Sequence, residues 1–171
     1  MTVLADLVSR MHRAQPDNGT VNRWSIQVLA AANATLGKSL PPFSVITLGG
    51  KTFSQNDLRG HYSIIGFWAS WADESKMAQR MMHRWKNKYG SRLEMFSVSL
   101  DIDPVAMKGD ARVDSISWTQ VCDYRSWDSP MVRLLAVPKL PYLILVDPQL
   151  TIKWRGSDTG QLSTVLQHTV K

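Results

Sequence analysis

The sequence contains a single cysteine, Cys122, among its 171 residues. One cysteine cannot form an intrachain disulfide, which excludes a disulfide scaffold and a cysteine-rich zinc site. Histidine is also scarce, and no two histidines have a ligand-like spacing such as H-x-x-x-H; the four are His12, His61, His83 and His168. We therefore expect no metal site, and we expect no cofactor.

Long hydrophobic runs are absent as well. A helix that crosses a bilayer needs ~18 to 20 consecutive apolar residues, and no run in this chain approaches that length. Near the amino terminus, Arg10 and Arg13 follow the apolar residues instead of preceding them, which is opposite to the order in a secretory signal. From the residues alone, the chain is either cytoplasmic or begins after a signal or an upstream domain.

Acidic residues are outnumbered by basic ones. The chain has 20 Lys and Arg against 14 Asp and Glu, a net charge of +6. Basic proteins bind nucleic acid when their charges gather into a patch or a recognition motif. Here the basic residues are spread along the chain without a dense run, and solubility explains such a charge. We expect no nucleic-acid partner.

The pattern of apolar residues divides the chain into two regions. Apolar residues recur at helical spacing over 3–11 and again over 21–36, and the turn-forming stretch QPDNGT separates the two segments. The pair Pro41–Pro42 marks the start of a region with a different pattern. We therefore predict a helical extension over residues 1–40 and one domain over residues 41–171.

Strand and helix patterns alternate through the second region. The run SIIGFW over residues 63–68 is typical of a central parallel strand that is buried on both faces. This alternation predicts an α/β fold, with a central mixed sheet and helices on both faces. The expected strands cover 43–47, 63–68, 93–100, 118–122, 142–146 and 152–154, and the expected helices cover 54–58, 73–89, 104–112, 129–135 and 159–170.

The predicted helix over residues 73–89 has two unlike sides. At 100° per residue one side is apolar, and we expect it to face the sheet; it carries Met77, Ala78, Met81, Met82, Trp85 and Tyr89. The other side is basic and carries Lys76, Arg80, His83 and Arg84. We expect the basic side to be solvated, with the docking of an acidic partner as the alternative.

Several motifs carry a family resemblance. A Gly-Lys hairpin and a Leu-Arg-Gly turn precede a strand that ends in F-W-A-S-W at residues 67–71. Trp118, with Val121 and Asp123, resembles an additional strand, and VPKLPYLILVD over residues 137–147 contains a proline next to that strand pattern. With these motifs, residues 41–170 resemble the TlpA/ResA type of thioredoxin-like proteins, which are related to the AhpC/TSA group.

The resemblance implies a thioredoxin-like fold. It also implies a thiol-disulfide oxidoreductase activity with a role in cell redox homeostasis. It also implies a cis peptide bond between Leu140 and Pro141, and a periplasmic or otherwise extracytoplasmic location. In this family the tryptophan of the motif is followed by Cys-x-x-Cys. A thiolate at a helix amino terminus is stabilised by the helix dipole, and the second cysteine resolves the mixed disulfide.

The two cysteines of that motif are missing from this chain. The matching positions read Ala72-Asp73-Glu74-Ser75, and neither an alanine nor a serine can take part in disulfide exchange. We therefore predict a pseudoenzyme, and the lack of sulfur also excludes peroxidase chemistry of the AhpC/TSA kind. Ala78 and Arg80 depart from the family pattern too, since many members have Glu and Pro there. Four coordinated departures favour a natural loss of function over an engineered pair of substitutions.

The loss of the two cysteines does not require the loss of the substrate-binding groove beside them. The resemblance places Trp71 beside the site, with Leu140 and Pro141 facing it, and such a groove receives extended polypeptide by strand addition. We therefore predict a module that binds an extended peptide or a protein partner. One alternative is a purely structural domain of an exported protein. The other is a thiol oxidoreductase that acts through Cys122, although we expect this cysteine to be buried and inert because no basic residue lies within two positions of it.

Overall fold

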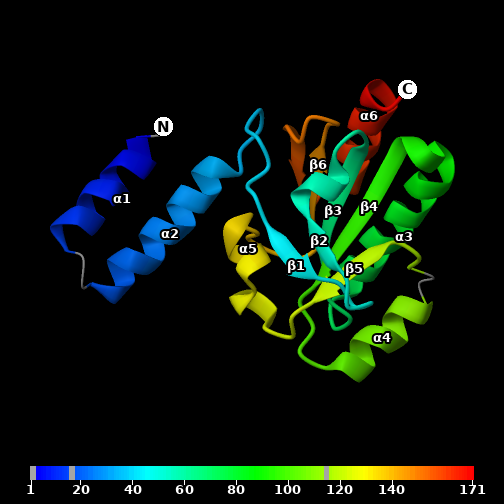
Figure 1. The fold of residues 1–171 in the computed structure, drawn as a ribbon, viewed down its shortest axis with the longest axis horizontal. Helices are drawn as coiled ribbons and strands as arrows, with labels where there is room; N and C mark the ends of the chain where they lie inside the picture. The colour runs from blue at the N-terminus through cyan, green and yellow to red at the C-terminus, as the bar shows by residue number, and fades with distance from the viewer. Residues whose placement is uncertain (1–2, 16–17, 114–115) are drawn as a thin grey trace.

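The centre of the molecule is a five-stranded sheet in the order β5-β4-β3-β6-β7 (Figure 1). The computed structural model describes residues 3–15, 18–113 and 116–171. Strands β3, β4 and β5 are parallel, whereas β6 runs antiparallel to β3 and β7 runs antiparallel to β6. The predicted mixed sheet is confirmed. Its strands are β3 (Tyr62–Trp68), β4 (Leu93–Ser99), β5 (Thr119–Cys122), β6 (Tyr142–Val146) and β7 (Ile152–Gly156).

Helices cover both faces of this sheet. On one face, α3 (Asp73–Tyr89) and α6 (Thr159–Thr169) bury Met82, Trp85 and Leu162 against the strands. On the other face lies α5 (Pro130–Leu134), next to the aromatic stack of Phe53 on Phe96, whose ring centroids are 4.5 Å apart. The other helical elements that follow β3 are α4 (Pro104–Val113) and the single turns η2 (Gly90–Arg92) and η3 (Ser126–Asp128).

A small hairpin precedes the main sheet. It pairs β1 (Ser44–Ile46) with β2 (Thr52–Ser54) through a turn in which Gly50 has a φ of +76°, a conformation that favours glycine. The single turn η1 (Gln55–Leu58) follows, and Ser54 and Asp57 form a capping box at its start. The sequence predicts the hairpin turn and a helical segment over residues 54–58, which the structure forms as η1. It does not predict β2, which has only three residues and pairs with β1 alone.

Two helices precede the hairpin. Helices α1 (Val3–Ala14) and α2 (Gly19–Asn33) pack against each other beside the sheet domain, and the carboxyl end of α2 approaches α5 (Figure 1). Residues 16–17, in the turn that we predict between them, lie outside the described residues. The side chain of Asn18 accepts hydrogen bonds from the first backbone N–H groups of α2, which explains where that helix begins.

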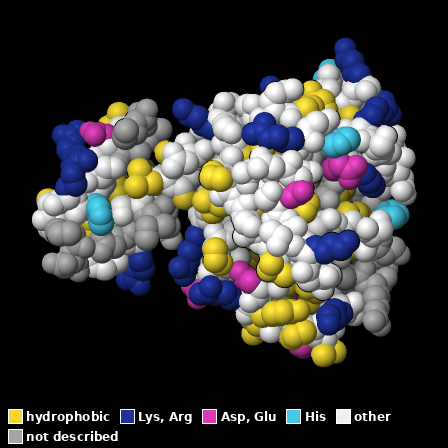
Figure 2. All heavy atoms as spheres, viewed as in Figure 1, with side chains coloured by type: hydrophobic (Ala, Val, Ile, Leu, Met, Phe, Trp, Pro, Cys, Tyr) yellow, Lys and Arg dark blue, Asp and Glu magenta, His cyan; other side chains and the backbone are white. Residues whose placement is uncertain are grey.

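Basic side chains are scattered over the face shown in Figure 2. They lie on the two amino-terminal helices and on the sheet domain and do not gather into one patch. Among the described residues, no helix combines the length and the apolar character needed to cross a membrane.

Candidate functional site

The loop from β3 to α3 holds the two positions that the family motif assigns to cysteine. Strand β3 ends at Trp68, and α3 begins at Asp73 with Ala72 as its capping residue. Ala72 and Ser75 are one helical turn apart, and the Ser75 N–H donates to the Ala72 carbonyl at 2.9 Å. The backbone therefore keeps the arrangement of a dithiol site, although neither position carries a thiol.

No side chain caps the start of α3. The methyl group of Ala72 can accept no hydrogen bond, and the side chain of Asp73 is exposed to solvent. Asp73 and Glu74 therefore favour this helix terminus only through the electrostatic attraction between their carboxylates and the helix dipole. A thiolate at residue 72 would gain the same stabilisation, which this chain leaves unused.

The Ser75 side chain is fully buried, and its hydroxyl has no hydrogen-bond partner among the described residues. A buried hydroxyl without a partner costs about 1 to 3 kcal/mol relative to an apolar group of the same size. A thiol is a weaker donor and behaves as a small apolar group. Residue 75 is therefore a position at which cysteine fits the surroundings at least as well as serine.

A buried carboxylate, that of Asp101, is hydrogen-bonded to the loop between β3 and α3. Asp101, at the end of β4, accepts hydrogen bonds from the Ser70 N–H at 3.0 Å, from the Ser70 hydroxyl at 2.6 Å and from the Ser99 hydroxyl at 2.5 Å. Because these donors compensate the buried charge, the carboxylate is a structural tie between the ends of β3 and β4. It leaves Trp71, the next residue along the loop, 57% exposed.

The one cysteine lies at the end of β5, in the same buried cluster as Trp68 at the end of β3. The Cys122 thiol is buried and donates to the Asp101 carbonyl at 3.3 Å. Burial raises the pKa of this thiol, and the nearby carboxylates of Asp101 and Asp123 raise it further. A high pKa keeps the group as a thiol, whereas disulfide exchange requires a thiolate. The site thus has the opposite character to a reactive cysteine.

The loop before β6 faces the start of α3. Its Leu140–Pro141 peptide bond is cis, as the resemblance implies, and the Pro141 carbonyl accepts a hydrogen bond from the Ser157 hydroxyl at 2.6 Å. Within the described part of the chain, neither the N–H nor the C=O of Leu140 has an intramolecular hydrogen-bond partner. These two groups are available to an added strand.

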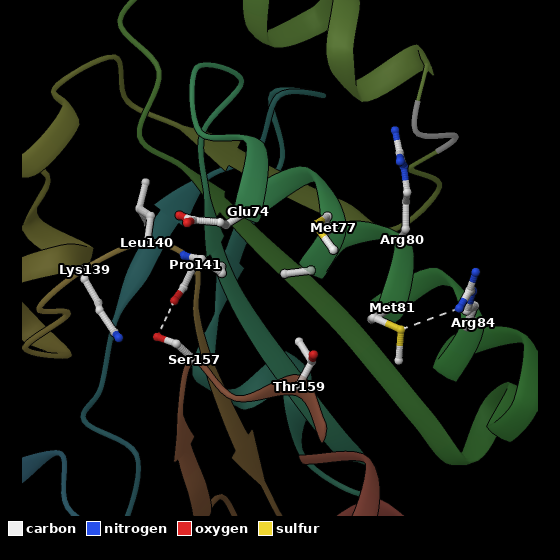
Figure 3. Close-up of a pocket in the computed structure, with 11 residues that line it drawn as sticks. Glu74, Met77, Arg80, Met81, Arg84, Lys139, Leu140, Pro141, Ser157 and Thr159 are labelled. Atoms are coloured by element: carbon white, nitrogen blue, oxygen red, sulfur yellow. Dashed lines mark hydrogen bonds between the residues drawn. The ribbon is translucent and has the colours of Figure 1, made fainter. Parts of the chain in front are cut away.

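A pocket of about 650 Å³ extends from this loop along the outer side of α3 (Figure 3). Glu74 lies beside Leu140 and Pro141 at one end, and Arg84 lies at the other. Eleven residues line the pocket: Glu74, Met77, Ala78, Arg80, Met81, Arg84, Lys139, Leu140, Pro141, Ser157 and Thr159. Leu140 and Pro141 are therefore brought together with α3, while Trp71 and Cys122 lie outside the lining.

Met77 corrects one prediction about α3. It is 65% exposed and lines the pocket, whereas we expect it to face the sheet. The buried side of the helix is rotated toward Ser75 and Gln79, two polar residues that the apolar pattern leaves out. The two remaining departures from the family pattern, Ala78 and Arg80, both line this pocket. Sequence reasoning did not single out Lys139, Ser157 and Thr159. Ser157 and Thr159 lie at the end of β7 and the start of α6, where the sequence has no motif.

Comparison with known proteins also finds thiol-disulfide oxidoreductases among similar structures. No family model matches the chain. A thiol-disulfide oxidoreductase from Bacteroides fragilis is 34% identical, with a TM-score of 0.66, over 75% of this chain and 100% of that one. The thioredoxin domain of a thiol-disulfide oxidoreductase from Bacteroides vulgatus has the same fold, with a TM-score of 0.72 and 22% identity over 80% of this chain and 99% of that one.

A curated relative supports the assignment. It is a thioredoxin-like protein of Bacillus subtilis, 29% identical over 63 residues, and the match spans 37% of each chain. The similarity to the Bacteroides fragilis protein covers the whole of that protein. The chain therefore belongs to the thioredoxin-like thiol-disulfide oxidoreductase family, as a member with Ala72 and Ser75 at the positions of the paired cysteines.

Proposed function

We propose that this protein is a redox-inactive thioredoxin-like module that binds an extended segment of a partner protein in its former active-site groove. The observation that carries the proposal is the combination of a preserved groove with absent sulfur. Ala72 and Ser75 keep the backbone geometry of the dithiol site, and the pocket beside Leu140 and Pro141 remains open.

Two features favour an extended occupant. The unpartnered N–H and C=O of Leu140 offer the pair of hydrogen bonds with which a sheet-like peptide docks. The exposed indole of Trp71 offers a large rigid contact surface in the neighbouring loop, and aromatic anchors of this kind dominate many interfaces. An extended segment that pairs with Leu140 while its flank reaches Trp71 would use both features.

The alternative functions make different demands. A thiol oxidoreductase acting through Cys122 would need an accessible thiolate, and the burial and raised pKa of this thiol argue against it. A purely structural domain would not need an open pocket. We also propose a periplasmic or otherwise extracytoplasmic location, which the family resemblance supports.

Disulfide reduction of a model protein substrate tests the redox part of the proposal. We expect the natural chain and Cys122→Ser to be equally silent, and Ala72→Cys/Ser75→Cys to gain activity because the scaffold still positions a thiolate at the start of α3. Activity in the natural chain that disappears in Cys122→Ser would instead assign the function to that cysteine.

Peptide binding tests the other part. A random peptide library displayed on phage is selected on the protein, and the enriched peptides are measured by fluorescence anisotropy. We expect Trp71→Ala to weaken their binding by about tenfold, the loss of one aromatic anchor. The matched control is Trp24→Ala on α2, because the two tryptophans are similarly exposed, at 57% and 55%. If no peptide is enriched, or if both variants behave alike, the groove is only a structural remnant.

A further inference from the structure

Helix α1 carries an apolar face that is exposed to solvent. At 100° per residue, Val3, Leu4, Leu7 and Met11 fall within an arc of about 100° on one side of the helix. These four side chains are between 39% and 89% exposed, whereas Val8, at the border of the same arc, is buried. Because α1 packs against α2, the neighbouring helix covers that border and leaves the face itself open.

The position of α1 makes this face accessible. Helix α2 lies between α1 and the sheet domain, so α1 occupies one end of the molecule (Figure 1). The neighbouring helix adds a further exposed apolar group, the indole of Trp24. Single apolar side chains at a surface need no explanation, but a row of them along one helix marks a surface that binds another protein or a membrane.

The rest of α1 is polar. Beyond the apolar arc the helix carries Asp6, Arg10 and Arg13. A helix with an apolar face and an arginine-bearing polar face lies in the plane of a bilayer surface, with its apolar side chains at the boundary between headgroups and acyl chains. Helix α1 has 12 residues, fewer than the ~20 that a spanning helix needs. The pattern therefore favours a helix that lies on a membrane over one that crosses it.

Charge decides which occupant fits this face. Arg10 is paired with Asp6, but Arg13 on α1 and Arg23 on α2 have no ion-pair partner among the residues that the structure describes. The whole chain has a net charge of +6. Two copies of the chain would bring like charges together at this face, whereas an anionic lipid surface attracts them. An anionic bilayer is therefore favoured over a second copy.

We propose that α1 attaches the protein to the surface of an anionic lipid bilayer. Leu4, Leu7 and Met11 enter the boundary between headgroups and acyl chains, and Arg13 and Arg23 are attracted to the lipid phosphates. The attachment uses none of the residues that line the pocket along α3. It therefore goes beyond the proposed function and does not depend on it.

Flotation with lipid vesicles tests this inference. Vesicles of phosphatidylcholine alone are compared with vesicles that also contain phosphatidylglycerol, at about 0.05 M and about 0.5 M salt, because salt screens the attraction to lipid charge. The variant is Leu4→Ala/Leu7→Ala, which shortens two side chains of the face but keeps a strong helix former at both positions. The matched control is Ile102→Ala/Val105→Ala outside α1, since these two side chains are at least as exposed, at 69% and 79%.

We expect the natural chain to bind the anionic vesicles at least about tenfold more tightly than the neutral ones at low salt. Leu4→Ala/Leu7→Ala should weaken this binding by at least about tenfold, because less apolar surface enters the bilayer, and the control should bind like the natural chain. The inference is overturned if neither kind of vesicle binds, which leaves a protein partner to cover the face. It is also overturned if both kinds bind equally, or if Leu4→Ala/Leu7→Ala binds as tightly as the natural chain.

Light scattering after size-exclusion chromatography tests for a second copy on the same face. We expect the natural chain and Leu4→Ala/Leu7→Ala to have the same mass in the absence of lipid. A dimer of the natural chain that dissociates in this variant would assign the apolar face to a second copy and overturn the inference.

Discussion

The Cys122 thiol illustrates how one residue's surroundings decide its chemistry. The side chain is 8% exposed and donates to the Asp101 carbonyl. We expect it to react with a thiol probe at least about tenfold more slowly in the folded protein than in denaturant, because the probe must wait for local opening. The measurement is the rate of labelling with and without denaturant. Rapid labelling of the folded chain would support the alternative in which this cysteine carries the activity.

The raised pKa of Cys122 also predicts a pH dependence of stability. Because the folded state holds the thiol proton more tightly than the unfolded state, its contribution is fully present below the ordinary thiol pKa of about 8.5. The contribution is lost as the pH rises through the folded pKa. We expect the unfolding free energy of the natural chain to fall more between about pH 7 and about pH 10 than that of Cys122→Ala, as measured by urea denaturation. Equal decreases in both proteins would show that the thiol is not the cause.

At the level of elements, the close packing of α3 on β3 requires a residue without a side chain at position 66 of β3. Gly66 lies in the middle of β3, and a Cβ at this position would be only 2.6 Å from the Met82 sulfur on α3. Met82 is fully buried, so it has little room to move. We expect Gly66→Ala to destabilise the protein by about 1 to 3 kcal/mol, as overpacked cores do. Chemical denaturation of Gly66→Ala, Met82→Ala and the double variant checks this, because the cost of the pair should be less than the sum of the two single costs.

The elements themselves follow well from the sequence. The predicted span of α3, residues 73–89, matches the structure, because its apolar periodicity is strong and Gly90 ends it. The run SIIGFW identifies β3 because a strand that is buried on both faces has apolar residues at successive positions, as Ile64, Ile65 and Phe67–Trp68 are here. The rotation of the buried side of α3 could not be predicted, since periodicity does not distinguish a methionine in the core from one that lines a pocket. Met77 is the residue on which the two differ.

The candidate site is less predictable than the fold. The positions of Ala72, Ser75 and Pro141 follow from the family motif. The rest of the pocket lining does not, because Lys139 lines the same pocket as Arg80 and Arg84 only through the folding of a loop distant in sequence. Side chains that line a pocket from different elements leave no local pattern. The boundary that we draw at residue 40 stays a prediction, although Ala34 and Leu40 are buried in the main core.

On the scale of the whole molecule, one arginine connects the helical extension to the sheet domain. The Arg155 guanidinium on β7 donates to the Ala34 carbonyl at the end of α2, to the Leu135 carbonyl at 2.8 Å at the end of α5, and to the Tyr142 hydroxyl at 2.7 Å. The carbonyls at the end of a helix lack intrahelical partners, so this one cation satisfies the ends of two helices. A planar fork can do this, whereas the single ammonium of a lysine cannot.

Replacing the Arg155 guanidinium should therefore weaken the attachment of the helical extension to the sheet domain. We expect Arg155→Lys to lower the unfolding free energy by about 1.5 to 3 kcal/mol, the range for hydrogen bonds to a charged group. We also expect faster amide hydrogen exchange at the carboxyl end of α2, because Ala34 loses its partner while the charge is kept. Arg59→Lys, which changes an exposed arginine in the same way, is the control. If exchange in α2 stays at the natural rate while the sheet is destabilised, then the backbone pairing of residues 37–40 with 150–152 holds the extension without the arginine.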